Sequence, residues 1–412
     1  MRTIEGFPYV SVQFTKDGAV HERAKIPEAT DLVVLCHGWN NTMTEAENFY
    51  TKLLGHLRAE LAANRVPGLA DRTFAVLGVL WPSKKFAPSE LTASGAAGTA
   101  SVVDGAVLDG QLRQLAELID DPAATAALDE ARKLVPELET RRTARQKFAE
   151  LLRSAAAGDA TEDEDASSDL FRLPGAEVME RLAKPVFGAG GRAGAGGSAA
   201  GLGRLFAGGP LGAARNLANY LTYYAMKERA GIVGAGGLYD VLTGARNQRL
   251  HLVGHSFGAR VVTAAVAGPR ERPPLRVASL SLLQAAFSHY GFAERYDGTK
   301  NGAFHRVVKD GLVSGPILIT HTQNDEAVGV AYPLASLLRK QVGSGLGDKN
   351  DRFGGLGRNG AQKTPGTVAG KSYAGGPARV YNLLADDFIR NHGDVANAGT
   401  AQAVLSAISA GK

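Results

Sequence analysis

The feature that most constrains the fold is a series of short apolar runs separated by helical patterns and turn residues. Each run is nearly continuous in apolar character and rich in β-branched residues, as is typical of strands buried on both faces of a parallel sheet. The runs cover residues 31–36, 73–80, 249–253, 276–283, 316–320 and 379–384. Their alternation with helical patterns predicts an α/β fold with a doubly wound, mostly parallel sheet.

Composition excludes several classes of protein. The formal net charge of the 412-residue chain is only +5, and no basic stripe of the kind that binds nucleic acid stands out. The single cysteine, Cys36, cannot form an internal disulfide. The N-terminus lacks the apolar stretch of a secretory signal, and no window is long and apolar enough to span a membrane. We therefore expect a cytoplasmic protein, unless a leader has been removed, and the sequence leaves its oligomeric state open.

The alternation of strands and helices breaks between residues 85 and 215. Leucines recur there at helical spacing, and the stretch 187–212 is dominated by glycine and alanine. We expect an α/β core formed by 1–84 and 216–412, with 85–215 as a helical, Gly-rich insertion that could serve as a cap over the active site. The alternative is a peripheral helical hairpin with a flexible linker. A second glycine-rich stretch, 343–376, is expected to be a surface loop.

The pentapeptide Gly254-His255-Ser256-Phe257-Gly258 is a candidate nucleophile site. The Gly-x-Ser-x-Gly pattern alone is weak evidence in a chain with 51 glycines. Its position is more informative, because it directly follows the run 249–253 and precedes a helical pattern over 259–266. A sharp strand–turn–helix junction of this kind is a nucleophile elbow, in which small neighbours let strand and helix approach closely. The sequence therefore predicts that Ser256 is a catalytic nucleophile.

A serine nucleophile needs a base that is itself oriented by an acid. In folds with this elbow the acid and then the base follow the serine, in loops after later strands. Asp325 follows the run 316–320, and His392 follows the run 379–384, so these two residues are the predicted acid and base.

The sequence also offers other acids and bases near these positions. Glu326 is adjacent to Asp325, and the position after 276–283 could carry the acid but offers Gln284 and no carboxylate. His289 and His305 precede the acid and break the expected order.

The oxyanion of a tetrahedral intermediate needs hydrogen-bond donors. The predicted donors are the backbone N–H groups of Phe257 and Trp39, with Asn40 as an alternative to Trp39. His37, Asn40 and His255 are candidates for lining the substrate pocket, although the histidines, like His321, could equally be structural. No His, Cys or Asp cluster has metal-ligand spacing, so no metal is expected.

These motifs resemble the α/β-hydrolase superfamily, in the broad group of bacterial serine esterases and lipases. The resemblance rests on 37–39, 254–258, Asp325 and His392, and covers residues 31 to about 400 without the insertion. It implies a sheet of about eight strands, acyl-enzyme chemistry and no cofactor. The chain departs from the familiar pattern because its insertion precedes the elbow.

The function expected from this resemblance is hydrolysis of carboxylic esters, with a small-molecule or lipid-like acyl substrate. The alternatives are an amidase or peptidase, a thioesterase, and a non-catalytic binding protein on a hydrolase fold. Neither the natural substrate nor its acyl chain length can be inferred from the sequence.

Overall fold

The computed structural model describes residues 2–21, 25–83, 100–156, 169–183, 209–245, 247–325, 328, 348–376 and 379–411. The chain divides into two compact units. The first consists of Met1–Lys84, Lys227–Val328 and Gly354–Lys412, and the second of Lys85–Met226 and Gly329–Phe353.

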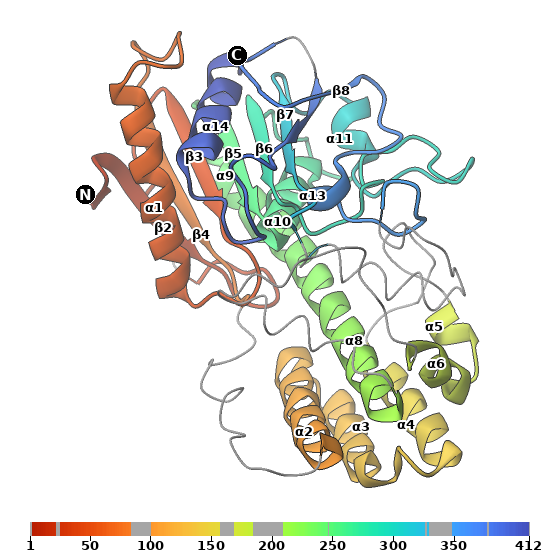
Figure 1. Ribbon diagram of the computed structural model, residues 1–412. Helices are drawn as coiled ribbons and strands as arrows, with labels where there is room; N and C mark the ends of the chain where they lie inside the picture. Colours follow the sequence, from red (N-terminus) through yellow and green to blue (C-terminus); the bar gives the residue numbers. More distant parts are fainter. Residues whose placement is uncertain are drawn as a thin grey trace. The chain divides into compact units, whose positions relative to one another are not determined.

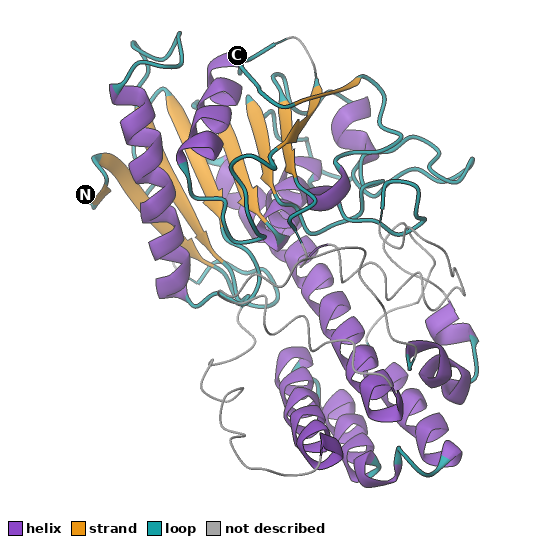
Figure 2. Ribbon diagram, in the orientation of Figure 1, coloured by secondary structure: helices purple, strands orange, loops and turns teal. Residues whose placement is uncertain are grey.

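The first unit is built on one nine-stranded sheet, drawn in orange in Figure 2. All neighbouring strands are parallel except the first pair, β1 and β2. In spatial order the strands are β1 (Thr3–Ile4), β2 (Phe7–Gln13), β4 (Phe74–Leu80), β3 (Asp31–Cys36), β5 (Arg249–His255), β6 (Ser279–Leu283), β7 (Ile317–His321), β9 (Val380–Leu384) and β8 (Thr367–Gly370).

The predicted α/β fold with a mostly parallel sheet is confirmed, and each of the six apolar runs contains a strand. The sheet has nine strands, where about eight were expected. The sequence did not predict β2, because buried and half-buried residues alternate in it and no continuous apolar run results. The expectation of a surface loop over 343–376 is wrong for part of that stretch. It contains β8 and a short helix, α13 (Leu356–Asn359), whose Leu356 is fully buried.

Helices cover both faces of the sheet (Figure 1). Helices α1 (Met43–Ala62) and α14 (Ala398–Ala410) share a hydrophobic core with alternate residues of β3, including Val33 and Leu35. Helix α10 (Phe257–Ala267) packs against β3, β5 and β6. Among its described residues, this unit also contains the end of α8 (Gly209–Val233), a π-helical turn at Gly234–Leu238 and the short helices α9 (Tyr239–Thr243) and α11 (His305–Lys309).

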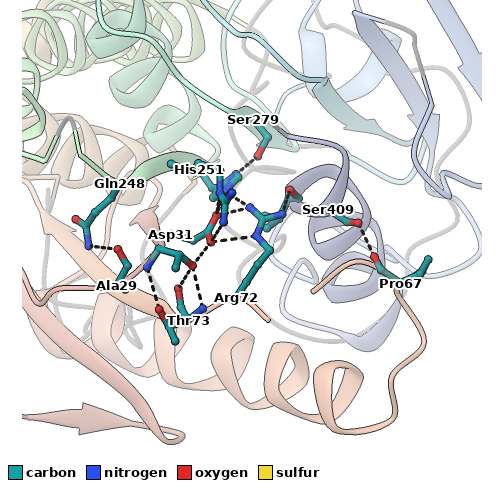
Figure 3. Close-up of polar contacts among 12 residues, drawn as sticks. Ala29, Asp31, Pro67, Arg72, Thr73, Gln248, His251, Ser279 and Ser409 are labelled. Carbon is teal, nitrogen blue, oxygen red and sulfur yellow. Dashed lines mark hydrogen bonds and ion pairs between the residues drawn. The ribbon is translucent and has the colours of Figure 1, made fainter. Parts of the chain in front are cut away.

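A buried polar network joins the amino ends of the central strands (Figure 3). The carboxylate of Asp31, which is fully buried at the start of β3, binds the guanidinium groups of Arg72 and Arg249. The two ring nitrogens of His251 lie 2.8 Å from Asp31 Oδ1 and 2.8 Å from Ser279 Oγ. The charges of Asp31 and Arg72 are thus removed from water together, and each compensates the other.

The second unit is mainly helical in its described part, apart from the turns of residues 348–353. Its helices are α2 (Ala100–Ile119), α3 (Pro122–Lys133), α4 (Arg142–Ala155), α5 (Asp169–Arg172), α6 (Gly175–Leu182) and the first part of α8 (Gly209–Val233), with a 3₁₀ turn at Val135–Glu137. Leucines at the predicted helical spacing, such as Leu108, Leu112 and Leu115, are fully buried. The insertion predicted at 85–215 overlaps this unit, but residue 215 lies inside α8 and the unit extends to Met226. Its role as a cap stays a prediction.

Residues 187–208 of the stretch dominated by glycine and alanine lie outside the described residues. Within the described part of the chain, no helix combines the length and the apolar character that a membrane span requires.

Candidate active site

The predicted site residues lie on loops that leave the same edge of the sheet. Strands β3, β5, β7 and β9 are parallel, so the segments that follow them all emerge at their carboxyl ends. His37 directly follows β3, Ser256 directly follows β5, Asp325 lies in the segment after β7, and His392 lies in the segment after β9. In open α/β sheets this edge is where ligands usually bind.

Ser256 occupies a sharp turn between β5 and α10. Its backbone has φ 56° and ψ −123°, a conformation that a residue other than glycine adopts only where the surroundings enforce it. The Ser256 N–H donates to Leu283 O at 3.0 Å, and Ser256 O accepts from Ala286 N at 3.1 Å. These bonds to the end of β6 and the segment after it hold the turn in place.

Three glycines allow this turn to form. A Cβ built on Gly254 would lie 2.5 Å from Ala259 Cα, and one on Gly258 would lie 2.3 Å from Cys36 O. A Cβ on Gly38 would lie 2.8 Å from the Ser256 Cβ. Side chains at these positions would push strand, helix and loop apart. The glycines therefore bring the end of β3 into contact with Ser256.

The structure brings Ser256, Asp325 and His392 into one hydrogen-bonded chain. The distance from His392 Nε2 to Ser256 Oγ is 2.8 Å, and that from His392 Nδ1 to Asp325 Oδ2 is 2.9 Å. Because a carboxylate only accepts hydrogen bonds, Nδ1 carries the proton and Nε2 is left to accept from the serine hydroxyl. The imidazole is thus held in the tautomer that can act as a base toward Ser256.

Charge supports the same assignment. Burial alone would lower the pKa of His392, but the negative charge of Asp325 and its hydrogen bond outweigh it and raise the pKa above 6.5. Asp325 is fully buried, which opposes ionisation, yet His392, the Val328 N–H and the Gln284 amide lower its pKa below the usual value. Asp325 is therefore ionised, and His392 is neutral only above its raised pKa.

The chain matches no protein-family model, no curated protein and no solved structure. Its function must therefore be argued from the geometry of its own residues.

The structure brings His255, a pocket candidate, into contact with the base. Its Nε2 lies 2.8 Å from the backbone oxygen of His392 and must donate, because a carbonyl only accepts. The two imidazole rings are 5.0 Å apart. Burial, followed by the nearby charge of His392, lowers the pKa of His255 to about 3, so its ring is neutral at ordinary pH.

The ring of His37 does not line a pocket, and the backbone N–H of Asn40 is already bonded elsewhere. His37 is 1% exposed, and its Nδ1 donates to Gly38 O at 2.9 Å, while burial lowers its pKa to about 4. Its ring is a neutral part of the core rather than of a pocket wall. Asn40 is exposed and has φ 64°, and its backbone N–H donates to Ser83 O at 2.9 Å. That bond takes the Asn40 N–H out of consideration as an oxyanion donor.

The two other oxyanion candidates lie close to the nucleophile. Phe257 is the first residue of α10 and directly follows Ser256, so the amino end of the helix begins at the nucleophile. Trp39 follows Gly38, which lies against the Ser256 side chain, and the rings of Trp39 and Phe257 meet edge to face at 5.9 Å. Both residues therefore stay predicted donors.

The alternative acids and bases are placed differently. Glu326 lies outside the described residues. His289 is fully buried and its Nδ1 accepts from the Asn359 amide at 3.1 Å, whereas His305 begins α11. His321 ends β7, and burial lowers its pKa. Within the described residues, no group of three or more His, Cys, Asp or Glu side chains is placed to hold a metal ion.

A contact between Gln284 and Asp325 is not predicted from the sequence, in which Gln284 marks only a position without a carboxylate. In the structure, Gln284 Nε2 donates to Asp325 Oδ2 at 3.0 Å. The only signal in the sequence was its place at the end of an apolar run.

Proposed function

We propose that this chain is a serine hydrolase of the α/β-hydrolase type that cleaves carboxylic esters through an acyl-enzyme on Ser256. The observation that supports this most is the continuous hydrogen-bonded chain from Ser256 Oγ through His392 to the buried carboxylate of Asp325. The strained backbone of Ser256 is a second support, because such strain is typical of a nucleophile elbow.

The proposed reaction has two halves. As Ser256 Oγ attacks the ester carbonyl carbon, its proton moves to His392 Nε2, and the N–H groups of Phe257 and Trp39 stabilise the oxyanion. The protonated His392 then gives its proton to the leaving alkoxide, and the acyl group stays on Ser256. A water molecule next loses a proton to His392 and attacks the acyl-enzyme, which releases the acid and restores the serine hydroxyl.

The carboxylate of Asp325 has two tasks in this cycle. It keeps the proton of neutral His392 on Nδ1, and it stabilises the imidazolium that forms at each transfer. The raised pKa of His392 has a further consequence. Protonation removes the base, so kcat/KM should decline as the pH falls through a value above 6.5.

The direct test is replacement of Ser256 by alanine. We expect Ser256→Ala to abolish both covalent labelling by a fluorophosphonate and turnover of p-nitrophenyl esters, because only the nucleophile is removed. Ser406→Ala is a suitable control, since Ser406 lies in α14 and donates to Gln402 O at 2.9 Å. Unchanged labelling of Ser256→Ala would refute the assignment. Matched esters, thioesters and anilides would then identify the bond that is cleaved.

A further inference from the structure

Gln284, which contacts Asp325 of the predicted triad, combines complete burial with a positive φ. It directly follows β6, is fully buried, and has φ 45°, in the left-handed region that is costly for a residue with a side chain. A buried and strained amide persists only where its surroundings compensate for the cost. The bonds made by Gln284 show what that compensation is.

All hydrogen-bonding groups of the Gln284 side chain have partners. Nε2 donates to Asp325 Oδ2 at 3.0 Å and to Gly357 O at 2.8 Å, and Oε1 accepts from Thr320 Oγ1 at 3.0 Å. The Gln284 backbone N–H also donates to Thr320 Oγ1, at 3.1 Å. A carboxylate and a carbonyl can only accept, so these partners fix the orientation of the amide.

The segment containing Gly357 joins the loop that carries the acid to the segment after β6. Gly357 N donates to Ala285 O at 2.9 Å, while Gly357 O accepts from Thr322 N at 3.0 Å as well as from Gln284. The guanidinium of Arg358 donates to Asp325 O at 3.2 Å and to Gln323 O at 3.0 Å. A Cβ built on Gly357 would lie 2.5 Å from the backbone carbon of Gln284, so only glycine fits there.

We propose that Gln284 and the segment 354–360 position the carboxylate of Asp325 for its bond to His392. Asp325 Oδ2 receives two donors, Gln284 Nε2 and His392 Nδ1, and Oδ1 accepts from Val328 N at 3.0 Å. With both oxygens bound, the carboxylate cannot rotate away from the imidazole. The neutral amide supplies this restraint without adding a charge to the pair. This inference depends on the proposed function, because it gives Asp325 its role there.

The test compares two substitutions of Gln284. In Gln284→Met the side chain keeps its approximate shape but cannot donate, so kcat should fall roughly 10- to 100-fold with little change in KM, as expected when a reacting group is misplaced. The His392 Nδ1 proton, followed by NMR, should exchange with water faster than in the unchanged protein. Gln284→Glu places a carboxyl group against Asp325. Its kcat should decline as the pH rises, because loss of the shared proton leaves two carboxylates in contact.

A matched control separates positioning from general destabilisation. Gln248, just before β5, is also a glutamine whose Nε2 donates to two acceptors, Pro27 O at 2.9 Å and Ala29 O at 3.2 Å, but it lies at the amino ends of the strands, away from the triad. Gln248→Met should lower the midpoint of thermal unfolding while leaving kcat and the exchange rate of the His392 proton unchanged. Equal kcat in Gln248→Met and Gln284→Met, or an unchanged exchange rate in Gln284→Met, would overturn the proposal.

The proposed function can fail separately. If the ester turnover of the unchanged protein does not require Ser256, the hydrolase assignment is wrong. The exchange rate of the His392 proton then still decides whether Gln284 restrains the pair of Asp325 and His392, because that measurement needs no substrate.

Discussion

At the scale of single residues, hydrogen bonds fix both the tautomer of His392 and the position of its backbone. Asp325 fixes the tautomer of His392 from one side. From another side, His255 donates to the backbone oxygen of His392 and so holds the segment that carries the base against the elbow. His255 is neutral, so it adds no positive charge where the proposed mechanism forms an imidazolium.

The bond made by His255 leads to a prediction about catalysis. His255→Phe keeps a ring in place but removes the donor, and kcat should fall about fivefold, since a buried hydrogen bond contributes about 1 kcal/mol. His255→Gln, whose amide nitrogen can reach the position of Nε2, should restore most of that loss. Steady-state ester kinetics would measure both. Phe49→Leu is the packing control, because the ring of Phe49 packs against that of His255, with the ring centroids 5.6 Å apart. Equal rates for His255→Phe and His255→Gln would contradict the role of the hydrogen bond.

At the scale of elements, the site depends on how closely α10 approaches the end of β3. Gly258 is the second residue of the helix and lies against the backbone oxygens of Cys36 and His37. Helix propensity favours alanine over glycine at such a position, but the close contact requires glycine. The local preference and the packing therefore conflict, and the packing determines the residue.

This conflict can be tested with two glycines that both lie in helices. Gly258→Ala should lower the free energy of unfolding by about 1–3 kcal/mol, because a Cβ would lie 2.3 Å from Cys36 O and the backbone must move. Gly110→Ala, in α2, has no atom within 4 Å of the added Cβ and should stabilise the protein by about 0.5–1 kcal/mol. Denaturant unfolding measures both. A stabilising Gly258→Ala would mean that α10 does not pack so closely.

At the scale of the whole molecule, the α/β unit has a polar network at each end of its sheet. The network at the carboxyl ends is the partly exposed chain of Ser256, His392 and Asp325. The one at the amino ends is buried around Asp31, where Arg72 also donates to Ile408 O near the end of α14. Both networks contain a Ser–His–Asp arrangement, because His251 is hydrogen-bonded to Ser279 through one ring nitrogen and to Asp31 through the other. Those three are almost completely buried, so their role is structural.

The buried network predicts how stability depends on pH. Asp31→Asn leaves the buried guanidinium of Arg72 and the partly exposed one of Arg249 without their anion and should lower the free energy of unfolding by about 3–5 kcal/mol at pH 7. Burial opposes ionisation of Asp31, but His251 and the two arginines lower its pKa well below the usual value. The carboxylate therefore stabilises the fold above the pKa of the unfolded chain, and this contribution is lost as the pH falls toward the folded pKa.

The difference in free energy of unfolding between the unchanged protein and Asp31→Asn should accordingly become smaller at acidic pH. Urea unfolding at several pH values would measure it. The comparison variant is Asp240→Asn, which removes an ion pair with Arg272 in which both side chains are about half exposed and should change stability by less than about 1 kcal/mol. Equal effects of Asp31→Asn and Asp240→Asn would show that the buried network contributes little.

The sequence by itself determined those features that depend on local pattern. Continuous apolar runs identified six strands of a mostly parallel sheet, because burial on both faces requires apolar residues at every position. The order of Ser256, Asp325 and His392 along the chain could also be predicted, since each follows a strand of that sheet. The residues that contact these three could not be predicted. Gln284 and His255 act through partners distant in sequence, such as Asp325 and His392.

Only the tertiary structure decided the rest. The ring of His37 packs into the core, so it does not line a pocket as predicted. The Asn40 N–H donates to Ser83 O, so it is not the oxyanion donor. The structure also showed that part of a glycine-rich stretch is buried next to the acid, where Gly357 allows the backbone to approach Gln284. Hydrogen bonds and close contacts between distant segments leave no periodic pattern in a sequence, so they became visible only in the folded chain.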